Sequence, residues 1–311
     1  MYPIYFSVVL PAYDTPPDIL RRAIDSVLNQ TYPYYELIIV DDGSTPSLEP
    51  IIREYTDERI VFIQHPKNRG AGAAHNSGIR AAKYDWIAFI CHDDEWLPNK
   101  LEVCAPYIMN NYPEYKFFFH FPIVIGDLKE IEKSPFYNPK PKTGNYYTNF
   151  LLDRYRIIQT SCIIVNKECF KNYGYYDETG VLIDWDIYLR FSKYIDFYCI
   201  NEFLSKYYLS PLGITQGEYL ILGDKAGNDV LKLFLKWQKE IKKSKEARKT
   251  WSIRLNAMAK IYIDKNDNKT AKQLYCLAIK LHPFWRGNYI DIIKIILWHK
   301  KQKNKNSQVK G

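Results

Sequence analysis

The segment DWIAFICHDDEWLP, residues 85–98, is the stretch that decides how this chain folds. An apolar run of strand length, Trp86 to Ile90, ends abruptly in a histidine and three acids. Two adjacent carboxylates at the end of a buried strand repel each other and lose hydration, so a cation or hydrogen-bond donors must compensate them. In open α/β sheets, ligands bind outside the carboxyl ends of the strands. The segment therefore predicts a divalent cation held by Asp93 and Asp94 at such an edge.

Strand-like and helical patterns alternate on both sides of this segment. Strands are expected at residues 7–10, 36–40, 59–64, 86–90, 116–125 and 161–165, and helices at 17–28, 73–83, 98–110, 167–173 and from 183 onward. This alternation implies βαβ units and a largely parallel sheet with right-handed crossovers. Residues 126–145 contain three prolines and predict a mobile loop over the site.

The composition is that of an ordinary globular protein, with 311 residues, 47% hydrophobic and 25% charged. This length accommodates one large α/β domain and a smaller appendage. The six cysteines form no CxxC pair, which indicates reduced thiols in a cytoplasm and disfavours a disulfide framework or a zinc site. The N-terminus lacks a signal sequence and the apolar runs are too short to cross a bilayer, so we expect a cytoplasmic protein.

The charge is distributed unevenly along the chain. Residues 1–214 hold 21 Lys/Arg and 27 Asp/Glu, whereas residues 215–311 hold 22 and 8. We therefore expect a catalytic or binding domain over 1–214 and a basic helical extension over 215–311. Such an extension meets an anionic partner, either phospholipid headgroups or nucleic acid. The first domain is acidic and no recognition motif is present, so nucleic acid is not predicted.

The extension has two parts. Residues 255–283 weakly resemble one tetratricopeptide helical hairpin, which would need to pack on another surface because a single repeat is unstable. Residues 289–298 alternate apolar pairs with a lysine and precede a polybasic end. This pattern fits a peripheral contact with an anionic membrane surface, here the inner face of the cell membrane, and equally a surface helix with a solvated end.

Four acidic or polar clusters follow predicted strands or strand–helix junctions. They are Pro11–Asp14, Asp41-Asp42, Asp93-Asp94 and Asp184 with Asp186. Each cluster alone is typical of a turn or a helix cap. Together they converge on one edge of one sheet, which is how a nucleotide site is built.

The order of six segments resembles the successive signatures of family 2 glycosyltransferases. The segments are VVLPAYD (8–14), SVLNQTY (26–32), ELIIVDDGST (36–45), NRGAGAAHNSGIRAA (68–82), HDDEWLPNKLE (92–102) and DWDIYLR (184–190). The resemblance covers residues 6–190 and not the tail beyond about residue 215. It implies the GT-A fold, with a Rossmann-like central sheet, and inverting transfer of a sugar from a nucleoside diphosphate, with UDP favoured by family habit.

The resemblance also assigns roles to individual side chains. The residues that it implies for the donor nucleotide are Pro11, Tyr13, Asp14, Asp42, Arg69, Asn76 and Asp93. Tyr13 would stack on the base and Asp42 would accept from a base N–H. Asp94, with Asp93 as a second contact, would hold Mn²⁺ or Mg²⁺ against the diphosphate, where the metal acts as a Lewis acid.

Inversion requires a base that takes the proton of the acceptor hydroxyl. Family members supply it from a Glu-Asp pair, whereas this chain reads Ile183-Asp184, so Asp184 inherits the role. The competing interpretation of Asp184 is a helix N-cap, and Asp186 is expected to be structural, as a first-turn acid. Two further departures are Cys91 at the first acid of the family's Asp-x-Asp-Asp turn and the absence of a histidine near residues 207–210.

These observations predict a metal-dependent enzyme that glycosylates a glycan or a lipid-linked glycan in cell-surface polysaccharide biosynthesis. The alternative is a non-catalytic scaffold of the same fold in a glycan-assembly complex. A third hypothesis is a protein that binds nucleic acid through its basic tail. The donor sugar and the linkage depend on the loop and on pocket shape, which the sequence does not specify.

Overall fold

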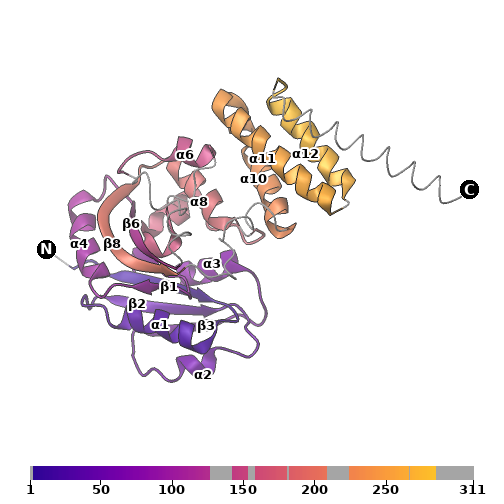
Figure 1. Ribbon diagram of the computed structural model, residues 1–311. Coiled ribbons are helices and arrows are strands. Elements are labelled where there is room, and N and C mark those ends of the chain that lie inside the picture. Colours follow the sequence, from indigo (N-terminus) through magenta and orange to yellow (C-terminus); the bar gives the residue numbers. More distant parts are fainter. Residues whose placement is uncertain are drawn as a thin grey trace, which may run out of the picture. The chain divides into compact units, whose positions relative to one another are not determined.

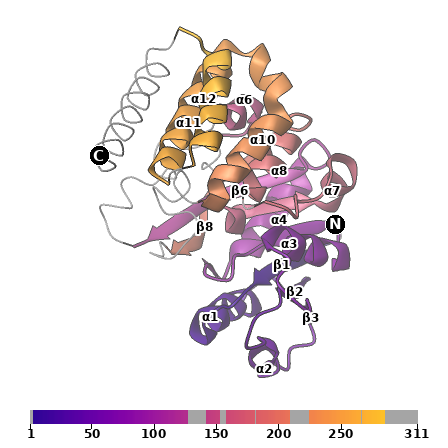
Figure 2. The same ribbon diagram turned by 90° about the vertical axis from the view of Figure 1, so that its right-hand side faces the viewer.

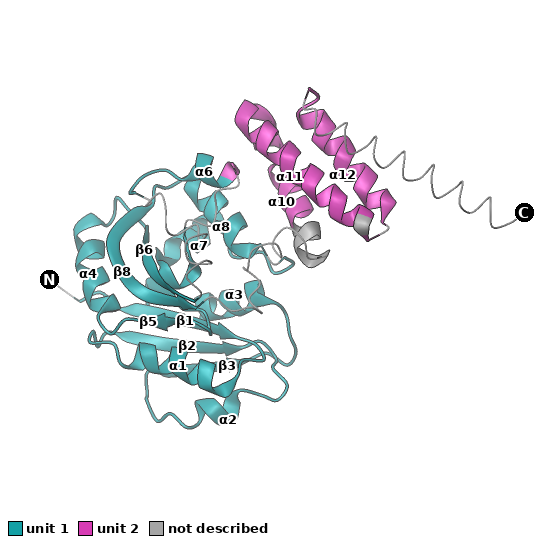
Figure 3. Cartoon of the chain, in the orientation of Figure 1, with its two compact units in different colours: residues 1–150, 154–213 teal, residues 151–153, 214–311 magenta. Residues whose placement is uncertain are grey.

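The computed structural model describes residues 3–126, 142–152, 158–180, 182–208, 224–265 and 267–284. The chain forms two compact units, coloured separately in Figure 3. Unit 1 comprises residues 1–150 and 154–213, and unit 2 comprises residues 151–153 and 214–311. Every predicted site residue belongs to unit 1.

Unit 1 is built on an eight-stranded sheet in the order β3-β2-β1-β4-β7-β6-β8-β5 (Figure 1). The strands are β1 (Phe6–Ala12), β2 (Tyr35–Asp41), β3 (Ile60–Gln64), β4 (Trp86–Phe89), β5 (Glu95–Trp96), β6 (Phe117–Ile125), β7 (Ile163–Asn166) and β8 (Tyr198–Tyr208). Strands β3, β2, β1 and β4 run parallel to one another, and β6 runs parallel to β8. Strand β7 is antiparallel to β4 and β6, and β5 is antiparallel to β8. The predicted α/β class with a mostly parallel sheet is confirmed.

The helices of unit 1 cover both faces of this sheet. They are α1 (Pro17–Leu28), α2 (Glu49–Ile52), α3 (Ala71–Ala81), α4 (Lys100–Asn111), α6 (Tyr147–Leu151), which ends in unit 2, α7 (Lys167–Tyr173) and α8 (Ile183–Ser192). Figures 1 and 2 show α1 and α2 on one side of β1 and β2, and α3 on the other side. Because both faces are covered, β1 and β4 are buried along their whole length and read as continuous apolar runs.

Several predicted boundaries differ from the structure by one or two residues, and two of them lie beside the predicted site. The predicted strand at 161–165 begins only at Ile163, because Thr160–Cys162 form a 3₁₀ turn, η2. The side chain and carbonyl of Ser161 bond to neighbouring segments there, so this residue does not join the ladder. Helix α3 begins at Ala71, two residues early, after Gly70 with φ of +93°. Of the predicted loop at 126–145, residues 127–141 lie outside the described residues.

Unit 2 contains α10 (Asp224–Lys243), α11 (Lys245–Asp264) and α12 (Asn268–Leu281). Ser244 caps α11 and Asp267 caps α12 through side-chain hydrogen bonds to backbone amides. Helices α11 and α12 pack together, and the Ser252 hydroxyl donates to the Ala278 carbonyl at 2.9 Å. Two packed helices therefore occupy the predicted hairpin at 255–283, whereas the predicted membrane-contact helix at 289–298 lies outside the described residues. Within the described part of the chain, none of the helices has the length and apolar character that a bilayer crossing requires.

Candidate active site

Three of the four predicted clusters meet at one edge of the sheet. Ala12 pairs with Asp41 in the parallel register of β1 and β2, and Val9 pairs with Phe89 in that of β1 and β4. The carboxyl ends of these parallel strands therefore lie side by side, at the edge of the sheet where α/β proteins bind their ligands. The clusters Pro11–Asp14, Asp41-Asp42 and Asp93-Asp94 lie at these strand ends and in the turns that follow them.

Asp42 is buried, and its carboxylate is occupied by neighbouring groups. Its Oδ1 accepts from the Arg69 amide at 3.0 Å, and its Oδ2 accepts from the Gly70 amide at 2.7 Å. His65, which directly follows β3, places Nδ1 2.6 Å from Oδ1 and Nε2 2.8 Å from the Ser77 hydroxyl. A carboxylate has about four acceptor positions. Three of these positions are taken by Arg69, Gly70 and His65, so Asp42 fixes the loop before α3.

The turn after β1 is joined to the turn after β2. The Asp14 amide donates to the Ser44 hydroxyl at 2.9 Å, and the Thr45 amide donates to Asp14 Oδ1 at 3.0 Å. Asp14 has a φ of 45°, a left-handed conformation that Asp tolerates better than most residues. Pro11 is buried within β1, whereas Tyr13 is 44% exposed, so its ring is available for stacking.

Asp94 lies at the centre of a buried polar network. Its Oδ2 accepts from the Ser161 hydroxyl and from the Gln159 amide nitrogen. Its Oδ1 is buried and has no hydrogen-bond partner. Burial, followed by the neighbouring Asp93 carboxylate, raises the pKa of Asp94 to about 7. A buried oxygen without a partner, beside a second acid, is the environment that a cation would stabilise.

A metal ion fits the oxygen donors of this turn. One ligand atom each of Cys91, Asp93 and Asp94 lies within 4.8 Å of the other two. Carboxylate oxygens suit Mg²⁺ and Mn²⁺, whereas thiolates suit softer ions. Burial raises the pKa of the Cys91 thiol well above its ordinary value. Asp93 and Asp94 are therefore the residues that would hold the ion.

The sequence did not predict the polar groups beneath this turn. Lys100, the first residue of α4, is fully buried, and its Nζ donates to the Ser161 carbonyl at 2.7 Å. The same Nζ lies 3.5 Å from the centre of the Trp96 ring. Burial lowers the pKa of Lys100 to about 7. Two sequence signals could have pointed to such groups. His65 directly follows strand β3, at the sheet edge where ligands bind in α/β folds, and residues 159–161 are a polar run just before β7.

Asp184 lies in the first turn of α8. The Thr160 hydroxyl donates to its Oδ2 at 2.8 Å, and its Oδ1 is buried with no hydrogen-bond partner. Burial raises the pKa of this carboxyl, while nearby His75 and Thr160 lower it. The N-cap of α8 is Leu182 and no side chain caps the helix, so Asp184 is not an N-cap.

Asp186 has a structural role. It is buried, and its Oδ2 accepts from the Arg190 guanidinium at 2.9 Å. The same guanidinium donates to three backbone carbonyls, those of Tyr173, Gly174 and Tyr175. The pair thus fastens α8 to the end of α7.

Arg69 and Asn76 bond to the loop that follows α7. The Asn76 amide donates to the Tyr176 carbonyl at 3.0 Å and accepts from the Tyr176 amide at 2.9 Å. It also donates to Glu178 at 2.9 Å, and Arg69 donates to the same carboxylate at 3.1 Å. Asn76 is thus used in holding this loop on α3, whereas Arg69 is half-exposed.

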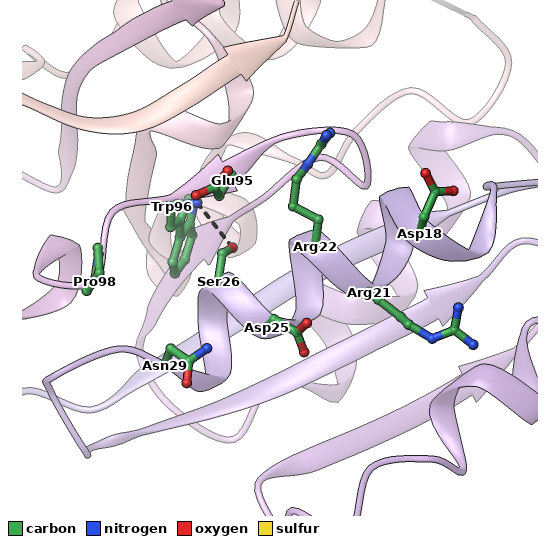
Figure 4. Close-up of a pocket in the computed structure, with 9 residues that line it drawn as sticks. All are labelled: Asp18, Arg21, Arg22, Asp25, Ser26, Asn29, Glu95, Trp96 and Pro98. Atoms are coloured by element: carbon green, nitrogen blue, oxygen red, sulfur yellow. Dashed lines mark hydrogen bonds between the residues drawn. The ribbon is translucent and has the colours of Figure 1, made fainter.

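An open cavity of about 560 Å³ lies beside the acidic turn, between α1 and β5 (Figure 4). Its lining is Asp18, Arg21, Arg22, Asp25, Ser26, Asn29, Glu95, Trp96 and Pro98. None of these is a predicted site residue. Arg22 nevertheless supports the turn, because its guanidinium donates to the Asp93 carbonyl at 2.6 Å and lies over the Tyr208 ring at 3.8 Å.

Solved structures share this fold. S. aureus TarS 1-349 in complex with UDP-GlcNAc aligns with a TM-score of 0.56 at 13% identity, covering 87% of this chain and 90% of that one. The mannosyltransferase PcManGT from Pyrobaculum calidifontis, in complex with GDP-Man and Mn²⁺, aligns with a TM-score of 0.55 at 13% identity, covering 95% and 81%. Together with the sheet topology, these similarities confirm the predicted GT-A fold.

Sequence comparison gives the family. The Escherichia coli protein WfgD, a UDP-Glc:alpha-D-GlcNAc-diphosphoundecaprenol beta-1,3-glucosyltransferase, is 28% identical over 240 residues, covering 73% of this chain and 89% of WfgD. Four other curated relatives are matched over 44% to 69% of their own length. The family model described as glycosyl transferase family 2 matches residues 7–174, more than half of the chain. This chain therefore belongs to glycosyl transferase family 2.

Proposed function

We propose that this glycosyltransferase is inverting and metal-dependent. In this proposal it moves a sugar from a UDP-sugar to a hydroxyl of a glycan or lipid-linked glycan, in cell-surface polysaccharide biosynthesis. The observation that carries the proposal is the pair of buried carboxylates, Asp94 and Asp184, each with one oxygen that has no hydrogen-bond partner. The donor and acceptor classes are supported by WfgD, whose name specifies UDP-Glc and a diphosphoundecaprenol-linked sugar.

The donor would lie across the edge formed by β1, β2 and β4. Tyr13 offers an exposed ring for the base, and Asp42 fixes the loop beside it. Asp93 and Asp94 would hold Mn²⁺ or Mg²⁺, which when bound supplies Lewis-acid stabilisation of the charge on the departing diphosphate. Ser161 and Gln159 orient the Asp94 carboxylate through its other oxygen.

Asp184 would act as the general base. Its carboxylate takes the proton of the acceptor hydroxyl as that oxygen bonds to the anomeric carbon of the sugar. The bond between the anomeric carbon and the diphosphate oxygen breaks, and its electron pair leaves with the diphosphate. Attack from the face opposite the leaving group inverts the anomeric configuration. Burial favours this role, because the raised pKa makes the carboxylate a stronger base.

The test uses the full chain with Mn²⁺ and a panel of UDP-sugars, scored first by thermal stabilisation and then by donor turnover. Asp94→Asn should abolish the Mn²⁺-dependent stabilisation by UDP, whereas Glu95→Gln should retain it. Glu95 is the matched control because it adjoins Asp94 but is paired with Lys206 at 2.7 Å. Asp184→Asn should retain donor binding and lower turnover by about 10²- to 10⁴-fold, the usual contribution of a general base.

The product's anomeric proton, followed by NMR, reports the stereochemistry: an α-linked donor should give a β-linked product. Retention of configuration, metal-independent turnover or full activity of Asp184→Asn would each contradict the proposal. Binding of donor without turnover in the wild-type chain would favour the scaffold alternative.

The location of the reaction is part of the proposal. A lipid-linked acceptor would place the enzyme at the inner face of the cell membrane, in contact with it through residues 289–311. These residues lie outside the described part of the chain. Flotation of the full chain with anionic liposomes, lost on truncation after residue 288, would support that contact.

A further inference from the structure

One face of α10, in unit 2, is a continuous row of lysines, which we call the lysine stripe. Its members, all of them exposed, are Lys232, Lys236, Lys239 and Lys243. Successive members are four, three and four residues apart in the sequence, so they are neighbours on one side of the helix. With a rise of about 1.5 Å per residue, the lysine stripe extends over about 16 Å.

The opposite face of α10 is apolar and packs within unit 2. Its buried residues are Val230, Leu233, Phe234, Trp237 and Ile241. The centre of the Phe234 ring lies 5.7 Å from the centre of the Trp251 ring, which belongs to α11. Because α11 covers the apolar face, the lysine stripe lies on the side of α10 that faces away from α11.

The lysine stripe holds more charge than the acids of α10 can balance. Asp229 and Glu240 are the two acids of this helix within four residues of a stripe lysine, so they could pair with at most two of its four members. Solvated helix faces usually alternate glutamate with lysine at this spacing, because like charges three or four residues apart destabilise a helix. The lysine stripe lacks this alternation, and its charge is complementary to an anionic surface.

An exposed leucine borders the lysine stripe. Leu235 lies between Lys232 and Lys236 in the sequence and is 47% exposed. Lysine has its charge at the end of a long apolar stem, so the ammonium groups can bind phosphates while a leucine beside them enters the apolar boundary of a membrane. The phosphates of a nucleic acid would attract the same lysines but would gain nothing from Leu235. Leu235 therefore favours a membrane surface as the partner.

We propose that the lysine stripe of α10 binds the anionic phospholipids of a membrane surface, with α10 parallel to the membrane plane. The four ammonium groups bind headgroup phosphates, and Leu235 enters the boundary between headgroups and acyl chains. This surface is distinct from residues 289–311, for which a membrane contact is proposed above. It is also independent of the proposed chemistry, whose residues all belong to unit 1.

The test is flotation of the full chain with vesicles of phosphatidylglycerol and phosphatidylcholine in equal parts. Vesicles of phosphatidylcholine alone serve for comparison and should bind the chain far more weakly. In the stripe variant, all four lysines of the lysine stripe are replaced by glutamine, which keeps a high helix propensity. Each lysine close to an anionic surface strengthens binding by about fivefold, so the partition coefficient of the stripe variant should fall by about 10²- to 10³-fold.

A matched control removes the same charge elsewhere in unit 2. In the control variant, glutamine replaces four exposed lysines of α11 and α12, namely Lys260, Lys269, Lys272 and Lys280. Its partition coefficient should fall much less than that of the stripe variant, because these lysines lie outside the lysine stripe. Leu235→Ser should weaken vesicle binding by up to about tenfold. Circular dichroism and urea unfolding should show that all variants fold as the wild type does, since the replaced side chains are exposed.

Three results would overturn the proposal. They are a wild-type chain that does not float with the phosphatidylglycerol vesicles, a stripe variant that floats as the wild type does, and equal losses in the stripe and control variants. Stripe-dependent binding of a duplex DNA of mixed sequence, without flotation, would identify a nucleic acid as the partner and would also overturn it. Donor turnover in solution requires no vesicles, so a failure of the proposed function and a failure of this proposal are separate results.

Discussion

Replacing Gly78 by alanine should reveal how tightly α3, the helix that carries His75 and Asn76, is packed on the sheet. A Cβ added at Gly78 would lie 2.4 Å from Val9 Cγ1 and 3.1 Å from Val9 Cγ2. Ordinary contacts between carbon atoms are about 3.5–4.0 Å, so one methyl group must move by about 1 Å. Val9 is fully buried in β1 and β-branched, and therefore has no alternative rotamer that would relieve the clash readily.

The expected free-energy change follows from two opposing effects. Overpacking a core costs about 1–3 kcal/mol, and this clash with a rigid strand belongs near the upper value. Alanine stabilises a helix interior by about 1 kcal/mol relative to glycine. Gly78→Ala should therefore destabilise the protein by about 2 kcal/mol. Val9→Ala removes two buried methyl groups, worth about 0.8 kcal/mol each, and leaves a cavity, for a total of about 2–3 kcal/mol.

Urea unfolding of the two single variants and the double variant gives the coupling energy. In the double variant the new Cβ occupies part of the space that Val9 leaves. The double variant should lose only about 2 kcal/mol, so the two losses should fall short of additivity by about 2 kcal/mol or more. Additivity of the two changes within about 0.5 kcal/mol would refute the packing of α3 against β1 described above.

Two further changes test the polar groups that hold the site. Lys100→Met should remove a pH dependence of the free energy of unfolding. The pKa of Lys100 is about 7 in the folded chain and about 10.4 in the unfolded chain. Between these pH values the unfolded state binds more protons, so the stability of the wild type rises with pH. The urea midpoint of wild type minus that of Lys100→Met should increase from pH 7 to 9.5, and a constant difference would contradict the buried, depressed lysine. Asn76→Ala should cost about 2–4 kcal/mol, because it leaves the Tyr176 amide and carbonyl without partners. The control Asn172→Ala removes an exposed hydrogen bond to Glu168, and its free energy of unfolding should stay within about 0.5 kcal/mol of the wild type in the same assay. Equal losses of stability in the two variants would show that Asn76 does not fasten the loop.

The candidate site was predictable where one strand and its following turn contain the information. The acids after β1, β2 and β4 reach the same edge because the strands are parallel, and parallel pairing follows from the alternation of strands and helices. Strands β5 and β8 were not predicted: β5 has only two residues and so no periodicity, and the buried and exposed positions of β8 do not alternate. Strand β7 was predicted, but its antiparallel direction depends on a longer connection that no local pattern specifies.

The roles of the individual polar side chains were harder to predict from the sequence. The sequence predicted Asp42 and Asn76 as contacts for the donor. In the structure, both side chains hold neighbouring loops in place through hydrogen bonds to backbone groups. Asn76 bonds to Tyr176, 100 residues away, and Asp42 bonds to Gly70, 28 residues away. Hydrogen-bond partners at such separations are fixed only when the intervening elements have packed.

The sequence by itself determined the family, the fold class and the acids that line the strand ends, because period, turn chemistry and motif order are local properties. The tertiary structure alone decided which oxygens of those acids remain without partners. Asp94 and Asp184 each have one bonded and one unbonded oxygen, since Ser161 and Thr160 reach them from the 3₁₀ turn before β7. The burial that raises the pKa of these acids arises from packing, not from neighbours in sequence.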